Sequence, residues 1–224
     1  MTESYLMSLD PDRMLHNFRV NAGLQPKAPV YGGWESEPTW ADIHCHGHTL
    51  GHYLSACSLA YRSTGRAEFK RRIDYIASEL NACQDAANSG LVCAFPSGAG
   101  LVAAHLRGEP ITGVPWYTLH KILAGLRDAA QLADSAMSRK VLLRFADWVV
   151  VATRPLGHAE FETMLETEHG GMSEVMIDLF DMTGNEDYRT TGENFAQKAI
   201  LRPLAEGRDY LDGLHANTQI PKII

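Results

Sequence analysis

Residues 48–80, HTLGHYLSACSLAYRSTGRAEFKRRIDYIASEL, decide the fold. Apolar residues recur every three or four positions on both sides of a break at Thr64-Gly65, which is the spacing of two amphipathic helices. A glycine just past a helix end readily adopts the left-handed conformation that caps the helix, and Glu68 suits the dipole of the first turn that follows. The stretch therefore predicts two helices joined by a tight turn.

The same pattern occurs twice more along the chain. Breaks at residues 133–135 (Ala-Asp-Ser) and 183–185 (Thr-Gly-Asn) each lie between two apolar stripes of helical spacing. The six stripes are Leu50-Tyr53-Leu54-Cys57-Tyr61, Phe69-Ile73-Ile76-Leu80, Leu119-Ile122-Leu123-Leu126, Val141-Phe145-Trp148-Val149, Met172-Val175-Met176-Leu179-Phe180 and Tyr188-Phe195-Ala199. No segment of comparable length alternates with period two, so the sequence predicts an all-α fold of three repeated hairpins.

Long irregular stretches, roughly residues 23–46, 88–114 and 201–218, separate the hairpins. Repeated hairpins with long loops at one end are typical of an α/α toroid or an α-solenoid. A closed (α/α)6 toroid has six hairpins, so three hairpins predict about half a ring. We expect residues 1–224 to be the N-terminal part of an (α/α)6 barrel, with the rest of the barrel outside this sequence. The alternative is an α-hairpin binding or assembly module that forms homo-oligomers through its open, apolar ends.

Composition limits the partners and the location. The 224 residues carry 20 Lys and Arg against 27 Asp and Glu, a net charge of −7, which argues against nucleic acid as a partner. No apolar run is long enough to span a bilayer, so we expect no membrane partner. The first residues lack the pattern of a secretory signal, which predicts a cytoplasmic protein and leaves an exported longer form open. Four cysteines without a CxxC pair are expected to be reduced and buried.

Histidines recur at equivalent places in the three hairpins. His52, His120 and His169 precede their turns by 12, 13 and 14 residues, and His48 lies one helical turn before His52. If the hairpins stack in register, these imidazoles lie at the same end of neighbouring helices, where the long loops enter. There they could hydrogen-bond the hydroxyls of a sugar or another polyol, or bind a metal. The alternative is that they satisfy backbone groups at helix ends.

A metal site is a further hypothesis for the segment His44-Cys45-His46-Gly47-His48. His48 and His52 are four residues apart, so both can lie on one helical face, as in a small metal-dependent enzyme. However, Thr49 follows His48 where the zinc-protease pattern HExxH needs glutamate. We therefore expect a junction of loop and helix that lines a pocket, and no metal.

Acidic and aromatic residues add to the candidate site. Four glutamates (Glu162, Glu166, Glu168, Glu174) surround Gly170-Gly171. Two carboxylates in a cleft are the usual equipment for glycoside hydrolysis, and the alternative is a solvated acidic helix face. The pair Trp116-Tyr117 is either a platform on which a sugar ring stacks or an anchor in the core.

Several motifs together resemble the β-L-arabinofuranosidases of glycoside hydrolase families 127 and 146, and family 146 more than 127. The similar stretches are LDPDRMLHNFRVNAGL (9–24), GGWE (32–35), GHTLGHYLSA (47–56), PWYTLHKILAGL (115–126), EHGGMSEVMIDLFDMTG (168–184) and LDGLHANTQIPK (211–222). The resemblance implies an (α/α)6 catalytic barrel followed by β-sandwich domains. It implies removal of terminal β-L-arabinofuranose from plant glycans with retention of configuration.

The resemblance also implies roles for residues. The family's nucleophile is a cysteine thiolate held on zinc by further cysteines and a glutamate, with a separate glutamate as acid/base. Its histidines bind the sugar hydroxyls. His169 and His215 match such positions best, and His48, His52 and His120 match less well. Trp116, Tyr117 and Glu168 complete the set that we expect to bind substrate.

The sequence departs from the family in one important respect. The zinc ligands and catalytic glutamates follow the segment that matches residues 211–222, and none of Cys45, Cys57, Cys83 or Cys93 lies in a matching motif. We therefore expect no catalytic residue, metal ligand or cofactor within residues 1–224, although zinc is expected for the complete family domain. The expected partner is an arabinofuranosyl glycan, which these residues alone are expected not to cleave.

Overall fold

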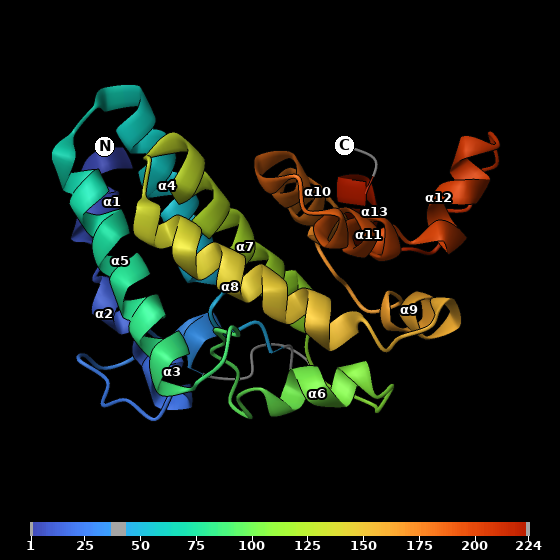
Figure 1. Ribbon diagram of the computed structural model, residues 1–224, viewed down its shortest axis with the longest axis horizontal. Coiled ribbons are helices and arrows are strands. Elements are labelled where there is room, and N and C mark those ends of the chain that lie inside the picture. The colour runs from blue at the N-terminus through green and yellow to red at the C-terminus, as the bar shows by residue number, and fades with distance from the viewer. Residues whose placement is uncertain (1, 37–43, 223–224) are drawn as a thin grey trace.

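The computed structural model describes residues 2–36 and 44–222. These residues form helices and no strand (Figure 1), which confirms the all-α prediction. The N-terminal arm consists of α1 (Thr2–Ser8), α2 (Pro11–Met14), α3 (His16–Asn21) and the 3-10 turn η1 (Gly33–Glu35). The long helices are α4 (His48–Thr64), α5 (Ala67–Ala86), α7 (Pro115–Leu132), α8 (Ala136–Thr153), α10 (Met172–Thr183) and α11 (Glu186–Phe195). The short ones are α6 (Gly100–Leu106), α9 (His158–Met164), α12 (Lys198–Ala205), α13 (Ala216–Gln219) and η2 (Ile220–Lys222).

In the described residues the three expected hairpins are present, as α4–α5, α7–α8 and α10–α11. Gly65 and Gly184 end the first helices of the outer two hairpins in the left-handed conformation, with φ of +67° and +72°. Their N–H groups donate to the carbonyls of Tyr61 (2.8 Å) and Phe180 (2.7 Å). In the middle hairpin Asp134 has φ of +47°. The turns are therefore the helix-capping turns that the sequence predicts.

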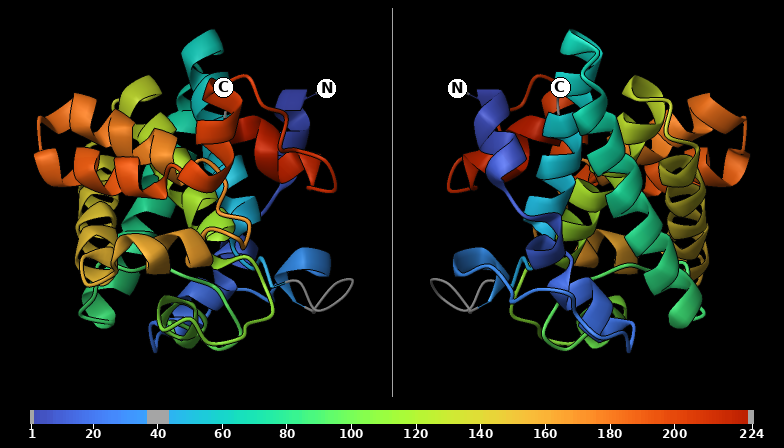
Figure 2. Two further views of the ribbon diagram at one scale, coloured as in Figure 1. Left: turned by 90° about the vertical axis from the view of Figure 1, so that its right-hand side faces the viewer. Right: turned by 90° about the vertical axis from the view of Figure 1, so that its left-hand side faces the viewer.

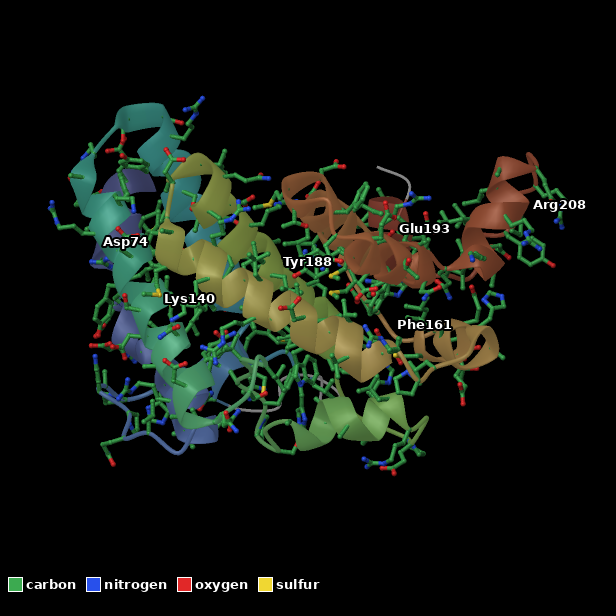
Figure 3. All side chains as sticks on the ribbon, viewed as in Figure 1. Asp74, Lys140, Phe161, Tyr188, Glu193 and Arg208 are labelled. Carbon is green, nitrogen blue, oxygen red and sulfur yellow. The ribbon has the colours of Figure 1, made fainter. Side chains whose placement is uncertain are left out.

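The hairpins form an arc of two layers. Helices α4, α7 and α10 lie side by side in one layer, while α5, α8 and α11 pack against them as the other (Figure 1, Figure 2). Within the second layer, α8 and α11 are also linked by a hydrogen bond. The Tyr188 hydroxyl of α11 donates to the Asp147 carboxylate of α8 at 2.6 Å, where Figure 3 shows Tyr188 between these helices. The arrangement is that of successive hairpins in an α/α toroid.

The contact between α4 and α7 is unusually close because both helices carry glycine at the crossing. A methyl group added at Gly51 would lie 2.1 Å from the Lys121 carbonyl oxygen, and one added at Gly125 would lie 2.4 Å from the Gly51 carbonyl oxygen. No side chain fits in that space. The crossing therefore brings His52, the neighbour of Gly51, beside the segment of α7 that carries Lys121.

The loops are more helical than the sequence suggests. The stretch 88–114 contains α6, and the stretch 201–218 begins inside α12 and ends in α13. Helix α11 ends at Phe195, so the prediction that Ala199 continues its stripe is wrong. Helices α6, α12 and α13 have eight residues or fewer, which is shorter than the stretch over which helical spacing can be recognised in a sequence. Part of the first stretch, residues 37–43, lies outside the described residues, as do Ile223 and Ile224.

All four cysteines are free and buried, as predicted. Among the described helices none is long and apolar enough to cross a membrane.

Candidate functional site

The structure brings the histidines of the three hairpins together. His52 comes from α4 and His120 from α7, while His169 lies three positions before the start of α10. Both His52 and His169 lie close enough to influence the pKa of His120. The His48 ring lies 5.8 Å from that of His52. We call His48, His52, His120 and His169 the histidine rim.

His120 is held by two glycines. A methyl group at Gly170 would lie 2.8 Å from Nδ1 of His120, and one at Gly171 would lie 2.8 Å from its Nε2. The ring occupies the space that side chains at 170 and 171 would need. Nδ1 is buried and has no hydrogen-bond partner. Burial above all, with the charges of Lys121 and Arg127 next, lowers the pKa of His120 to about 3, so its imidazole is neutral at physiological pH.

His169 is also buried and neutral. Its side chain is 1% exposed, and its Nδ1 lies 3.3 Å from the Thr167 carbonyl oxygen. Burial first, and then the ammonium group of Lys222, lower the pKa of His169 to about 4. When Nδ1 donates to the Thr167 carbonyl, Nε2 is an acceptor. The two buried members of the rim therefore offer hydrogen bonds without positive charge.

The α4 side of the rim is built around a buried carboxylate. His48 Nδ1 lies 2.7 Å from the Cys45 carbonyl oxygen and 3.9 Å from Glu35 Oε1. Glu35 is 4% exposed; its Oε2 accepts the Gly47 N–H at 2.7 Å, and its Oε1 has no hydrogen-bond partner. Trp34 contacts the His48 ring edge-on at 6.2 Å.

Sequence reasoning missed Glu35 as a site residue. The available signal was the motif GGWE itself, since it is one of the stretches that resemble the family. Only the three-dimensional structure shows that the loop places this carboxylate beneath His48.

Charged residues lie near the rim. Lys121 Nζ lies 5.0 Å from the centre of the Tyr117 ring, which itself lies 6.1 Å from His48. Burial raises the pKa of Tyr117, and the half-buried Glu168 adds to that effect. Burial lowers the pKa of Lys222 to about 8, against the influence of Glu168 and Glu162. Tyr117 and Glu168 therefore lie near the rim.

A cavity of about 290 Å³ opens beside His169 and Gly170-Gly171. Lys222 also lines it, and its ammonium group donates to Gln197 Oε1 (2.5 Å) and Gln219 Oε1 (2.8 Å). The rim therefore borders a space with hydrogen-bonding groups on its walls.

Two of the expected substrate-binding residues lie elsewhere. Trp116 is fully buried, donates from Nε1 to Met164 Sδ at 3.0 Å, and packs at 5.0 Å against Phe195. A sugar cannot stack on it, so the platform interpretation is wrong for Trp116, because its helical stripe faces the core. His215 is exposed at the start of α13, and within residues 2–36 and 44–222 no hydrogen bond or ring contact joins it to the rim.

Two of the four glutamates are structural. Glu162 accepts the backbone N–H groups of Lys198 (2.8 Å) and Ala199 (3.1 Å) and so caps α12. Glu174 pairs with Arg127 at 3.1 Å. The pair of free carboxylates needed for hydrolysis is therefore not found in Glu162 and Glu174.

The described residues do not fit the zinc centre that the resemblance implies. No group of three or more His, Cys, Asp or Glu side chains among them is placed to hold a metal ion. Cys45 lies near the rim, but burial above all, with the charges of Glu35 and Glu168, raises the pKa of its thiol to about 12. The hypothesis of a metal site in residues 44–52 therefore finds no ligand set in this structure.

An arc of helical hairpins in two layers is the architecture of α/α-toroid proteins, and here imidazoles from three successive hairpins gather at one end of the arc. Residues 1–224 match the model of the β-L-arabinofuranosidase GH127 catalytic domain, and the chain belongs to this family.

Comparison with solved structures agrees in fold. The chain is similar to a GH127 β-L-arabinofuranosidase from Geobacillus stearothermophilus T6, with a TM-score of 0.59 and 15% sequence identity over 96% of this chain. The match covers 33% of that protein, so the chain spans about a third of its length. No curated protein matches the sequence.

Proposed function

We propose that the chain forms the sugar-binding face of a β-L-arabinofuranosidase-type glycoside hydrolase and binds a terminal arabinofuranosyl residue of a glycan. The observation that carries the proposal is the convergence of His52, His120 and His169 from three successive hairpins. Membership of the family supplies the class of substrate.

Neutral imidazoles suit this task. A sugar hydroxyl both donates and accepts, and so does a neutral imidazole through its two nitrogens. The depressed pKa values of His120 (about 3) and His169 (about 4) keep both rings neutral wherever the protein works near neutral pH. Cleavage of a glycosidic bond develops positive charge on the sugar. Uncharged hydrogen-bonding groups hold the sugar without opposing that charge.

The carboxylates complement the imidazoles. The free Oε1 of Glu35 is an acceptor for a hydroxyl that approaches past His48. Glu168 lies close enough to Tyr117, Lys121 and Lys222 to raise the pKa of each. Together these groups offer acceptors on the two sides of the pocket.

We further propose that residues 1–224 alone do not break the bond. The described residues contain no ligand set for zinc, and the thiol of Cys45 is protonated at neutral pH. Zinc would supply a thiolate nucleophile in the complete family domain. Turnover of an aryl β-L-arabinofuranoside by the pure chain, abolished by His169→Ala, would contradict this part of the proposal.

Calorimetric titration with methyl β-L-arabinofuranoside tests binding. We expect saturable binding that His120→Phe weakens about tenfold or more, because one or more hydrogen bonds are lost. His158→Phe is the matched control, since His158 is exposed at the start of α9. If the wild type does not bind the sugar, or if His120→Phe binds it as tightly as His158→Phe does, the proposal is wrong.

An assembly module is the second candidate. Three large apolar side chains of the last segment are exposed, Tyr210 (58%), Leu214 (41%) and Ile220 (53%), which favours association with another surface. Light scattering at high concentration decides between a dimer, which supports this function, and a monomer, which removes it.

A further inference from the structure

Glu35 is a buried acid that reaches the histidine rim from the N-terminal arm. It ends the 3-10 turn η1 and is 4% exposed. Asn17 of α3 donates from Nδ2 to the Glu35 carbonyl oxygen at 2.7 Å and so ties the backbone of Glu35 to the arm. A carboxylate is costly to bury unless hydrogen bonds compensate for the lost water. The contacts of its two oxygens therefore define the role of this acid.

Glu35 Oε2 fixes the start of α4. It accepts the N–H of Gly47, the residue that precedes the first helical position, at 2.7 Å. Position 47 needs glycine, because its φ is +98° and a methyl group there would lie 2.7 Å from Cζ of Phe18. Glycine has no side chain with which to cap the helix. Glu35 therefore does from a distant segment what the acid of a capping box does from within the helix.

The same turn holds the His48 ring in one orientation. The Cys45 carbonyl oxygen lies 2.7 Å from His48 Nδ1 and also accepts the His48 backbone N–H at 3.1 Å. A carbonyl oxygen only accepts, so Nδ1 carries the proton, and in the neutral ring Nε2 is then an acceptor. Glu35 Oε1, 3.9 Å from Nδ1, favours the same tautomer, because its negative charge attracts the proton to the nearer nitrogen. Both oxygens of Glu35 therefore act on the turn that begins α4.

Three aromatic rings from three parts of the chain surround His48. The ring centres of Trp34, His52 and Tyr117 lie 6.2, 5.8 and 6.1 Å from that of His48. The His48 side chain is nevertheless 15% exposed. Since the Cys45 carbonyl occupies Nδ1, Nε2 is the ring nitrogen that remains for a ligand.

We propose that Glu35 is a positioning residue for sugar binding. Its carboxylate fixes the first turn of α4 and keeps the proton of His48 on Nδ1, so that His48 presents Nε2 as a hydrogen-bond acceptor to a sugar hydroxyl. The part that concerns the sugar rests on the proposed function, since the histidine rim defines where the sugar lies. The part that concerns the His48 ring does not, so the two parts are tested separately.

Nuclear magnetic resonance of the 224-residue chain tests the positioning without a sugar. At about pH 8, above the ordinary pKa of imidazole, nitrogen-15 spectra distinguish the two neutral tautomers. We expect wild-type His48 to carry its proton on Nδ1 and the Gly47 N–H to be protected from hydrogen exchange. Glu35→Met keeps the length of the side chain and removes both acceptors, so it should give mixed tautomers and about tenfold faster exchange. Glu35→Gln retains an acceptor for the Gly47 N–H and should restore both signals.

Calorimetry with methyl β-L-arabinofuranoside tests the consequence for binding. We expect Glu35→Met to weaken the affinity about tenfold, which is the value of roughly one hydrogen bond, and Glu35→Gln to weaken it less. If Glu35 acts through His48, the effects of changing the two residues are not additive. His48→Phe should therefore weaken binding about as much, and adding Glu35→Met to it should weaken binding little further.

Glu79→Met is the matched control. Glu79 is also a mostly buried acid, with a side chain 13% exposed, and it also contacts the N-terminal arm, through Arg19 and Lys27. It lies on α5, in the other layer of the arc. Its replacement should leave the His48 tautomer, the exchange of the Gly47 N–H and the sugar affinity unchanged.

The outcomes separate this inference from the proposed function. An unchanged tautomer and unchanged exchange in Glu35→Met overturn the positioning role, and so do additive losses of affinity with His48→Phe. If the wild type binds no sugar but the spectra change as expected, the proposed function is wrong and the positioning of His48 by Glu35 is supported. Should Glu35→Met fail to fold, Asn17→Ala releases the Glu35 backbone and should speed the exchange of the Gly47 N–H. Unchanged exchange in that variant then overturns the inference.

Discussion

The two sides of the histidine rim use the same side chain in different surroundings. On the α4 side, His52 is exposed and His48 lies beside the buried carboxylate of Glu35. On the α7–α10 side, His120 and His169 are 7% and 1% exposed and are held neutral by burial. Burial is the largest cause of the lowered pKa of His52 as well, so the two sides differ in degree, and only His120 and His169 are almost fully enclosed.

This contrast has a structural origin. The α7–α10 side is enclosed because Gly170 and Gly171 let the backbone close over the His120 ring. The α4 side is open because Gly51 makes the close contact between α4 and α7. The side chain of the neighbouring His52 stays exposed. The positions of these glycines therefore determine which histidine side chains are shielded from water.

Gly51→Ala should have the largest effect, because it separates the two sides of the rim. The new methyl group would meet the Lys121 carbonyl at 2.1 Å, and backbone cannot yield as a side chain does. We expect a loss of about 3 kcal/mol or more in the free energy of unfolding, measured with urea. Gly32→Ala is the control, since no atom lies within 4 Å of that position. Equal urea midpoints would show that α4 and α7 do not cross here.

Acid should destabilise the α7–α10 side more than the α4 side. A histidine with a lowered folded-state pKa is neutral when folded but takes up a proton when unfolded, below about pH 6.5. Stability is therefore complete above pH 6.5 and falls as the pH drops toward the folded values, about 4 for His169 and about 3 for His120. We expect a loss on the order of several kcal/mol over this window.

Matched variants isolate the source of that pH dependence. His169→Gln should flatten the plot of unfolding free energy against pH, and His52→Gln, at an exposed position, should change it less. Urea unfolding between pH 7 and pH 4 measures both. Parallel profiles for the wild type and His169→Gln would contradict the buried, neutral state of His169.

The sequence predicts the parts of this molecule that depend on local interactions. The turns at Gly65 and Gly184 are encoded within a few residues, so the three hairpins follow from capping and apolar spacing. The gathering of histidines follows as well, because equivalent positions in stacked repeats lie close together. The crossing at Gly51 depends on a partner about 70 residues away in sequence, at Lys121, and no local pattern reports it.

The neighbours Trp116 and Tyr117 show where local reasoning falls short within the site. Trp116 shares a helical face with Leu119 and Leu123, and this spacing indicates the core. Tyr117 lies one position further, and its ring faces the ammonium group of Lys121. The partnerless nitrogen of His105 is another feature that only the folded chain shows.

Gly170→Ala should damage the α7–α10 side with a moderate effect. Gly170 and Gly184 both have positive φ, +57° and +72°, so alanine costs about 1–2 kcal/mol of backbone strain at either position. Only at Gly170 would the methyl group also meet His120, at 2.8 Å from Nδ1, since nothing lies within 4 Å of Gly184. We expect both variants to lose stability and Gly170→Ala alone to lose arabinofuranoside binding. Binding retained by Gly170→Ala would mean that the His120 ring does not contact the sugar.

The smallest expected effects separate Trp116 from Tyr117. Trp116→Phe removes the N–H donor to Met164 Sδ from a fully buried position, so we expect a loss of about 1 kcal/mol in stability and an unchanged sugar affinity. Tyr117→Leu removes the half-buried ring between His48 and Lys121, so we expect a few-fold weaker binding and nearly unchanged stability, since a partly exposed cation–π contact contributes only about 0.5–1 kcal/mol.

Calorimetric titration and thermal unfolding of these two variants complete the comparison, each serving as the control for the other. The indole of Trp116 packs against Phe195, away from any cavity that the sugar could enter without unfolding the core. If Trp116→Phe weakened sugar binding as much as Tyr117→Leu, the sugar would have to reach the layer between α7 and α11. The buried side of α7 would then be part of the site. The division of the rim into a buried α7–α10 side and an exposed α4 side would be wrong.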